Sequence, residues 1–246
     1  MRVISMHKTN ASNEAGIPPS LELIAGMGEL MGELVKTGIL RSGGGLRASS
    51  LGVRLNFSGG KRTITNGPFT GGNELTAGFR IINVKSLDDA IEWATRFADV
   101  IGDVEIDIRP LCEPWDLGVC PKPEGLETTR FMLVHKADKH SEAGVLPDQA
   151  QIADLKKLTD DMVKAGVFQE AEELRPSSKG VRLRFSGGKQ TVIDGPFAES
   201  KELIAGFVIH EVNSIDESIA WAPPFAKLIG DVEIDIRPLY EPSDLA

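Results

Sequence analysis

The chain repeats itself after 128 residues, and this repeat restricts its possible folds more than any other feature. Asp103–Leu111 recurs letter for letter as Asp231–Leu239, no gap is needed anywhere, and about half of the aligned positions are identical. A repeat of this length has the size of a domain rather than of a solenoid unit. The sequence therefore predicts two like domains, at residues 1–118 and 130–246, joined by a linker at residues 119–129 that contains prolines and a glycine.

Each copy contains a regular series of hydrophobic patterns. Alternating apolar and polar residues predict strands, apolar residues at helical spacing predict two helices, and Gly59-Gly60 predicts the tight turn of a hairpin. Gly43-Gly44-Gly45 is replaced by Ala171-Glu172-Glu173 in the second copy and is predicted to be a loop. The predicted order is β-α-β-β-β-α-β, with these elements in the first copy: strand 3–8, helix 20–37, hairpin strands 53–57 and 61–65, strand 76–84, helix 87–97 and strand 103–109.

The helix ends carry signals of their own. Ser20 and Asp148 precede the first helix of each copy and are expected to cap it, because their side-chain oxygens can accept hydrogen bonds from free backbone N–H groups. Pro223-Pro224 replaces Thr95-Arg96 and should end the second helix near Ala222, because proline lacks the N–H that continues a helix. This difference predicts an asymmetry between the copies.

A β-α-β-β-α-β core of this size is typical of a ferredoxin-like α+β sandwich, in which both helices cover one face of an antiparallel sheet. The other face of each sheet then needs a cover. Two copies in one chain can provide it by packing sheet against sheet, as an intramolecular dimeric α+β barrel with an approximate two-fold axis. We therefore expect a pseudo-dimer, which can exist as a monomer or assemble further into a homo-oligomer.

Composition narrows the classes of partner. The formal net charge is −9, which disfavours binding to nucleic acid, and no apolar run approaches the ~20 residues that span a bilayer. No secretion signal is recognisable at Met1–Asn10, so a cytoplasmic location is expected. The two cysteines form no disulfide framework, and no His or Cys cluster has metal-ligand spacing. We predict no metal and no cofactor.

The first candidate site residues are histidines and carboxylates. His7 and His135 are the histidines that the repeat preserves, and alternation places His135 on the strand face of Phe131 and Leu133. An imidazole can exchange a proton near pH 7, so His135 is a candidate general base, with Asp194 or Glu142 as its carboxylate partner. Two alternatives remain open: the histidine is half-buried and bonded to backbone, and Asp194, which is aligned with Asn66, only stabilises a turn before Gly-Pro.

A second group of repeated residues could line a polar cleft. Its members are mostly charged side chains near strand edges, where charges are commonly solvated or paired. The residues predicted to bind a ligand are His7, Lys8, Lys136, Arg54, Arg182, Asn66 and Phe197. Ser58-Gly59-Gly60-Lys61 is interpreted as hairpin chemistry rather than a phosphate cradle, because it joins two strands.

Asp194-Gly195-Pro196-Phe197, followed by Glu202–Phe207, resembles the YCII-related proteins, in particular the branch with an Asp-Gly-Pro-Phe motif. The resemblance covers both copies and implies the dimeric α+β barrel fold. Some members of this branch are encoded beside extracytoplasmic-function sigma factors, which implies a protein partner in sigma-factor regulation. Relatives in the wider family are proposed to use a His and Asp pair, and a few act on small aromatic substrates.

That pair is missing from both copies. At the start of the first helix, where the family has its histidine, this chain has Pro18-Pro19-Ser20 and Leu146-Pro147-Asp148. After the tryptophan of the second helix, where the family has its aspartate, neither Trp93 nor Trp221 is followed by a carboxylate. We therefore expect a module that binds a small molecule or a protein partner. The alternative is a lyase or hydrolase that uses His135 with Asp194 or Glu142.

Overall fold

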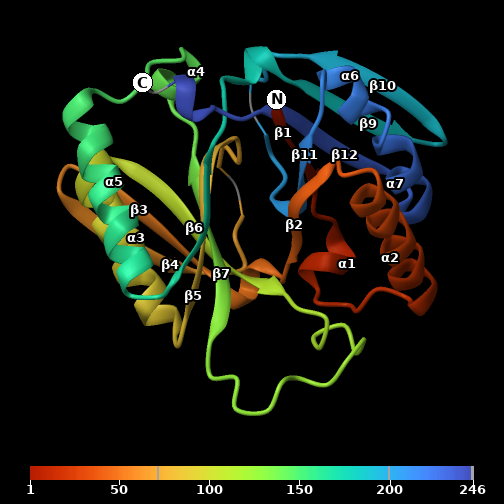
Figure 1. Cartoon of the computed structure of the whole chain (residues 1–246), viewed down its shortest axis with the longest axis horizontal. Helices are drawn as coiled ribbons and strands as arrows, with labels where there is room; N and C mark the ends of the chain where they lie inside the picture. The colour runs from red at the N-terminus through yellow and green to blue at the C-terminus, as the bar shows by residue number, and fades with distance from the viewer. Residues whose placement is uncertain (71, 199, 245–246) are drawn as a thin grey trace.

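Twelve β-strands form the centre of the molecule, seen here in a computed structural model that describes residues 1–70, 72–198 and 200–244 (Figure 1). The strands divide into two lobes. The α3/α5 lobe has the strand order β4-β3-β6-β7-β5-β8, and the α2/α7 lobe has the order β10-β9-β12-β1-β11-β2. The strands are β1 (Arg2–Lys8), β2 (Leu40–Leu46), β3 (Val53–Ser58), β4 (Lys61–Asn66), β5 (Thr76–Val84), β6 (Val104–Cys112), β7 (Thr129–Lys136), β8 (Phe168–Glu173), β9 (Val181–Ser186), β10 (Lys189–Asp194), β11 (Ile204–Glu211) and β12 (Val232–Pro238).

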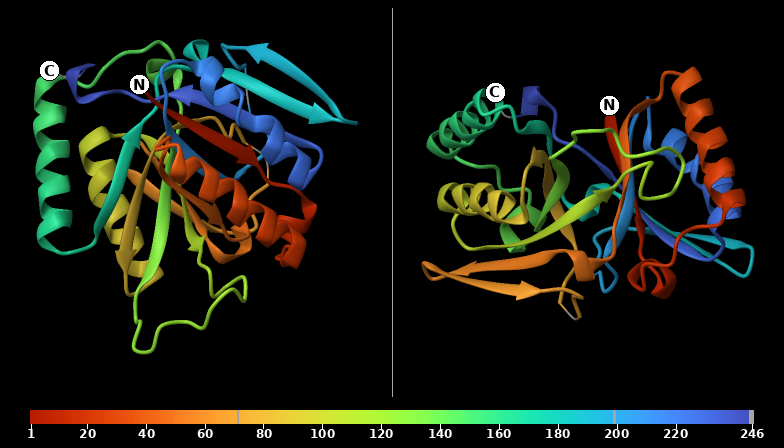
Figure 2. Two further views of the ribbon diagram at one scale, coloured as in Figure 1. Left: turned by 45° about the vertical axis from the view of Figure 1, so that its right-hand side comes forward. Right: turned by 90° about the horizontal axis from the view of Figure 1, so that it is seen from below.

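The helices are α1 (Ala11–Glu14), α2 (Leu21–Lys36), α3 (Leu87–Ile101), α4 (Lys139–Glu142), α5 (Gln149–Lys164), α6 (Ile215–Ile219) and α7 (Ala222–Ile229). Helices α2, α6 and α7 cover the outer face of one lobe, and α3 and α5 cover that of the other (Figure 1), while α1 and α4 are single turns. The predicted caps are confirmed: the Ser20 side chain accepts from Leu23 N, and that of Asp148 accepts from Gln151 N. The hairpins β3–β4 and β9–β10 lie at the edges of the two lobes (Figure 2) and turn at paired glycines with positive φ.

The two repeats exchange their first strands. β1 from the first repeat lies between β11 and β12 of the second, and β7 from the second lies between β5 and β6 of the first. Each ferredoxin-like sheet, β12-β1-β11-β2 or β6-β7-β5-β8, therefore takes two strands from each repeat. The repeat boundaries at residues 118 and 130 remain a prediction from the sequence. They do not separate the two lobes, because each lobe contains strands from both repeats.

The helix-free faces of the two sheets pack against each other, as the sequence predicted. A cluster of buried apolar side chains fills the space between them: Ile4, Met6, Leu46, Phe79, Ile81, Leu111, Met132, Val134, Leu174, Ile204, Phe207, Ile209 and Leu239. Short pairings join the sheets on both sides, Leu46 with Leu111 and Leu174 with Leu239, at positions related by the repeat. The fold is thus an α+β pseudo-dimer of ferredoxin-like sheets.

Two sequence predictions need correction. Gly43-Gly44-Gly45 is not a loop but part of β2, where an added Cβ at Gly44 would lie 2.7 Å from Leu111 Cδ2. The first copy therefore has one more strand than the sequence predicted. Pro223-Pro224 does create an asymmetry, but the helix resumes: α6 ends at Ile219, and α7 accepts both prolines in its first turn.

Candidate functional site

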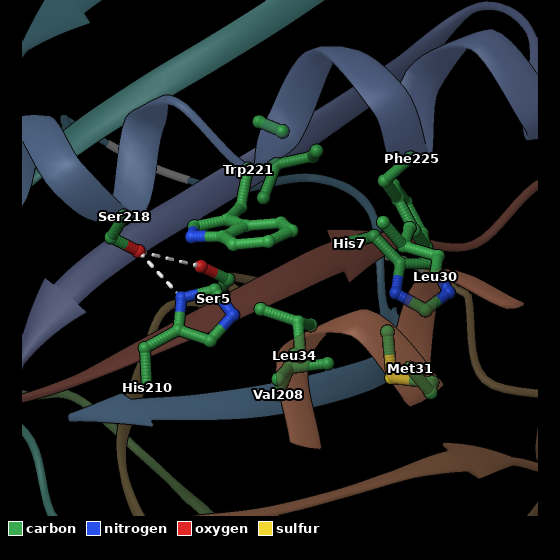
Figure 3. Close-up of a pocket in the computed structure, with 12 residues that line it drawn as sticks. Ser5, His7, Leu30, Met31, Leu34, Val208, His210, Ser218, Trp221 and Phe225 are labelled. Carbon is green, nitrogen blue, oxygen red and sulfur yellow. Dashed lines mark hydrogen bonds between the residues drawn. The ribbon is translucent and has the colours of Figure 1, made fainter. Parts of the chain in front are cut away.

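A cavity of about 40 Å³ lies in the α2/α7 lobe, between the helices and the sheet (Figure 3). Strands β1, β11 and β12 form its floor, and α2, α6 and α7 form its walls. Trp221, Phe225 and Met31 are partly exposed, so the cavity reaches the surface beside the helix pair. Its lining is mainly apolar, with four polar side chains; the residues are Ser5, His7, Leu30, Met31, Leu34, Val208, His210, Ser218, Trp221, Ala222, Phe225 and Ile234.

Three of the polar side chains form a chain of hydrogen bonds. His210 Nδ1 lies 2.8 Å from Ser218 Oγ, which in turn lies 3.3 Å from Ser5 Oγ (Figure 3). Ser218 comes from α6 and the other two from neighbouring strands, so the chain ties the helix to the sheet. Burial lowers the pKa of His210 to about 4, so its imidazole is neutral at pH 7.

His7 is the fourth polar group, and it has no hydrogen-bond partner among the described residues. Its ring lies against Phe225, with the ring centroids 4.9 Å apart, and burial lowers the pKa of His7 to about 4. Gly206 makes room for it, because an added Cβ there would lie 2.6 Å from His7 Cε1. The cavity therefore contains a neutral imidazole that can donate or accept a hydrogen bond.

The same place in the α3/α5 lobe is filled by the protein itself. His135 corresponds to His7, and its Nε2 lies 3.0 Å from a carboxylate oxygen of Glu173. Arg80 also binds Glu173, at 3.2 Å, and its guanidinium covers the Phe97 ring at 3.8 Å from the centroid. Burial alone would raise the pKa of Glu173, but electrostatic attraction to His135 and Arg80 and their hydrogen bonds hold it below its usual range.

Four replacements separate the two lobes at this point. Relative to the α3/α5 lobe, the α2/α7 lobe has a smaller or more polar residue at the corresponding positions: Val208 for Arg80, Gly45 for Glu173, Ser5 for Leu133 and Ser218 for Ala90. The long Arg80 side chain and the Glu173 carboxylate have no counterparts, so the space that they occupy is open. A further replacement, His210 for Ile82, adds a hydrogen-bonding group to its wall.

The repeated charged residues lie on the opposite side of the sheets, facing the space between the lobes. Asp107 is at the centre of one cluster: its oxygens lie 2.7 Å from Lys136 Nζ and 2.6 Å from Arg54 Nε, while Glu74 binds both cations. Burial would raise the pKa of Asp107, but Lys136 and Arg54 outweigh it and keep the carboxylate ionised. A gap of about 10 Å³ beside Glu74 has room for no more than one water.

The second cluster has the same design. Asp235 lies 2.7 Å from Lys8 Nζ and 2.6 Å from Arg182 Nε. Phe197 lies beneath the Arg182 guanidinium, 4.4 Å from the ring centroid, as Phe69 does beneath Arg54. The predicted ligand-binding cations are thus ion-paired, which favours the alternative that the sequence left open. Asp107 and Asp235 stand within the longest repeated segment, Asp103–Leu111 and Asp231–Leu239, which could have revealed them.

The contacts that Glu142 and Asp194 make in the described structure do not involve His135. Glu142 accepts hydrogen bonds from the Ser177 backbone and hydroxyl and from Arg237, so it stabilises the crossover between β8 and β9. Asp194 is the exposed last residue of β10, opposite Val181, and Asn66 is its exposed equivalent on β4. Neither His210 nor Glu173 was predicted as a site residue, because the repeat preserves neither: Ile82 and Gly45 stand at the equivalent positions.

The Asp-Gly-Pro-Phe motif has a clear steric role. Gly67-Pro68 and Gly195-Pro196 are both cis peptides, and an added Cβ at Gly195 would lie 1.8 Å from the carbonyl oxygen of Ser177. Only glycine fits there. The turn brings Phe197 N within 3.0 Å of Ser177 Oγ and places its ring under Arg182.

Comparison with known proteins agrees with this arrangement. A family model described as the YCII-related domain matches the chain twice, at residues 1–105 and 129–234. The chain belongs to the YCII-related family. An uncharacterised protein of Rhizobium meliloti (strain 1021) is 33% identical over 101 residues, which cover 40% of this chain and 82% of that protein. YCII-related domains in tandem, as the repeat predicted, are thereby confirmed.

In the described part of this YCII-related protein, no group of three or more His, Cys, Asp or Glu side chains could hold a metal ion. Across residues 1–70, 72–198 and 200–244, no helix has both the length and the apolar character needed to cross a membrane.

Proposed function

We propose that the protein is a binding module for a small, mainly apolar molecule, which occupies the cavity of the α2/α7 lobe. The observation that carries the proposal is the difference between the lobes: the same location is filled by Arg80 and Glu173 in one and open in the other. A general packing defect would not place an unpartnered imidazole and a serine–histidine chain in an apolar pocket. Ligand sites commonly combine an apolar lining with a few polar groups that orient the ligand.

The wall of the cavity is also suited to admitting a ligand. Helix α2 contains Gly26, Gly28 and Gly32, where α5 has Asp154, Lys156 and Asp160. Each glycine within a helix costs about 1 kcal/mol relative to alanine, so α2 is less stable as a helix than α5. The break between α6 and α7 lies directly at Trp221, on the other side of the opening.

Trp221 fluorescence tests this proposal. The wild-type protein is titrated with three uncharged one-ring compounds, toluene, phenol and cyclohexanol, and compared with Trp221→Phe and with the matched variant Trp93→Phe from the other lobe. Binding of at least one compound should change the emission of wild type and of Trp93→Phe, but not that of Trp221→Phe. If no compound changes the emission, or if Trp221→Phe responds as wild type does, the proposal is refuted.

An enzyme is the second candidate function, favoured by the His135–Glu173 contact of 3.0 Å. An imidazole next to a carboxylate is the usual arrangement of a general base. In this candidate His135 keeps the role predicted from the sequence, but Glu173 replaces Asp194 or Glu142 as its partner. Because Arg80 also holds Glu173, a substrate would have to displace the Arg80 guanidinium from Phe97. Loss of a measured turnover in Glu173→Gln, but not in Asp194→Asn, would support it.

A further inference from the structure

The α3/α5 lobe shows what shape of group fits the cavity of the α2/α7 lobe. In the α3/α5 lobe, the flat guanidinium of Arg80 is stacked on Phe97, next to the imidazole of His135. The repeat keeps the two neighbours, as Phe225 and His7, and they are in contact with each other in the same way, at 4.9 Å against 5.2 Å between ring centroids. The flat group itself has been removed, by the change to Val208.

The lining also defines the charge of the occupant. No Lys, Arg, Asp or Glu is among the described residues that line the cavity, and the polar groups present are two imidazoles and two hydroxyls (Figure 3). An ionised ligand would lose its hydration without gaining an opposite charge, which is costly in an apolar site. The Glu173 carboxylate, which neutralises Arg80 in the other lobe, has been lost together with it. An uncharged occupant fits both changes.

A hydrogen-bonding group on the ligand is required by His7. Its ring lies beside the position of the flat group and has no hydrogen-bond partner among the described residues, whereas His135 is bonded to Glu173. A ligand that excludes water from this half-buried ring would leave it without a partner, which costs free energy unless the ligand itself bonds to the ring. A hydroxyl can serve, because it both donates and accepts.

We propose that the ligand is a flat, uncharged single ring bearing a hydroxyl group, with the ring on Phe225 and the hydroxyl hydrogen-bonded to His7. The ligand belongs to the phenol class and is no larger than one ring; the cavity of about 40 Å³ encloses part of it, and the rest lies in the opening beside the helix pair. This inference rests on the proposed function, since it specifies the ligand of the same site.

Calorimetry at pH 7.5 with phenol, cyclohexanol and benzoate tests the inference. Phenol and cyclohexanol share the hydroxyl but differ in flatness, and stacking on an aromatic ring favours the flat compound by several-fold in affinity. Benzoate is flat but charged, and should bind at least tenfold more weakly than phenol. His7→Leu should weaken phenol binding about tenfold and leave toluene binding within a factor of two.

Two variants fill the cavity in the manner of the other lobe. The double variant Val208→Arg, Gly45→Glu rebuilds the Arg80–Glu173 pair, and Gly45 tolerates the change because an added Cβ there meets only Cys112 Cβ at 3.5 Å. Ser5→Leu copies Leu133 and serves if the double variant does not fold. Either folded variant should lose phenol binding.

The outcomes separate this inference from the function on which it rests. Cyclohexanol or benzoate binding as tightly as phenol would overturn the inference and leave the binding function standing. Phenol binding that survives in a folded cavity-filled variant would overturn it as well, because the ring would then lie elsewhere. If none of toluene, phenol and cyclohexanol binds, both proposals fail.

Discussion

Acid should destabilise the protein through His210, and the effect can be calculated from its surroundings. His210 is 4% exposed, and burial lowers its pKa from 6.5 to about 4. A base whose pKa is lower in the folded state stabilises the fold fully above pH 6.5 and loses that contribution as the pH falls toward 4. Between pH 8 and pH 4.5 the loss amounts to about 2.5 kcal/mol for this one histidine.

Replacement of His210 by the residue of the other lobe tests the calculation. The double variant His210→Ile, Ser218→Ala reproduces Ile82 and Ala90, so it removes the titrating group without leaving Ser218 unpaired. Urea unfolding at pH 8, 6.5, 5.5 and 4.5 gives the free energy of unfolding for wild type and variant. The wild type should lose about 2.5 kcal/mol more than the variant over this range.

The difference between the two curves isolates His210, because all other titrating groups are common to both proteins. His140→Gln is the matched control, because the His140 side chain is 67% exposed and its replacement removes no buried group. Parallel curves for wild type and the double variant would refute the conclusion that His210 is buried in its neutral form.

Three further predictions concern other parts of the molecule. Burial raises the pKa of Glu172 to about 6, so ionisation of its carboxyl group destabilises the fold. As the pH rises from 4.5 to 7, wild type should lose about 2 kcal/mol of stability that Glu172→Gln does not lose. Equal losses in the two proteins would contradict the raised pKa. Asp107→Asn removes the carboxylate that Lys136 and Arg54 share and leaves Glu74 to neutralise both buried cations. It should cost up to roughly 3–5 kcal/mol in denaturant unfolding, while the exposed control Asp194→Asn should cost under ~0.5 kcal/mol. Similar costs in the two variants would refute the structural role of the cluster. Because each sheet needs strands from both repeats, residues 1–118 expressed alone should give no folded monomer in size-exclusion chromatography with circular dichroism, and a folded monomer would contradict the strand exchange.

Much of the fold could be predicted because both copies of the repeat carry the same patterns of apolar residues, caps and turns. The hairpin at Gly59-Gly60, the Ser20 cap and the buried face of His135 all follow from local chemistry and alternation. Strand β2 escaped prediction because Gly43-Gly44-Gly45 carries no side chains and therefore no periodic pattern, although its backbone pairs normally with β11.

The exchange of first strands could not be predicted for a different reason. β1 and β7 have similar patterns of apolar and polar residues, so either strand could complete either sheet. Nothing in the sequence distinguishes the two pairings. Packing of the faces decides, and that depends on the whole molecule.

The repeat that made the fold predictable also caused part of the candidate site to be missed. The repeat drew attention to positions that are the same in both copies, and these are mostly structural: Asp107 and Arg54 pair with each other, and Glu142 holds Ser177. The cavity arises where the copies differ, as at Val208 and His210. Polar residues that replace apolar ones on a helix-covered strand face are the signal that could have located it.

A crystal structure of the protein soaked with phenol is the most direct test of the central claim. Density for a ring is predicted between α2 and α7, stacked on Phe225 with its oxygen within hydrogen-bond distance of the His7 imidazole, and none beside Phe97, where Arg80 lies. Density at both places, or an empty cavity between α2 and α7 with phenol bound elsewhere, would contradict the claim that this lobe alone is built to receive a ligand.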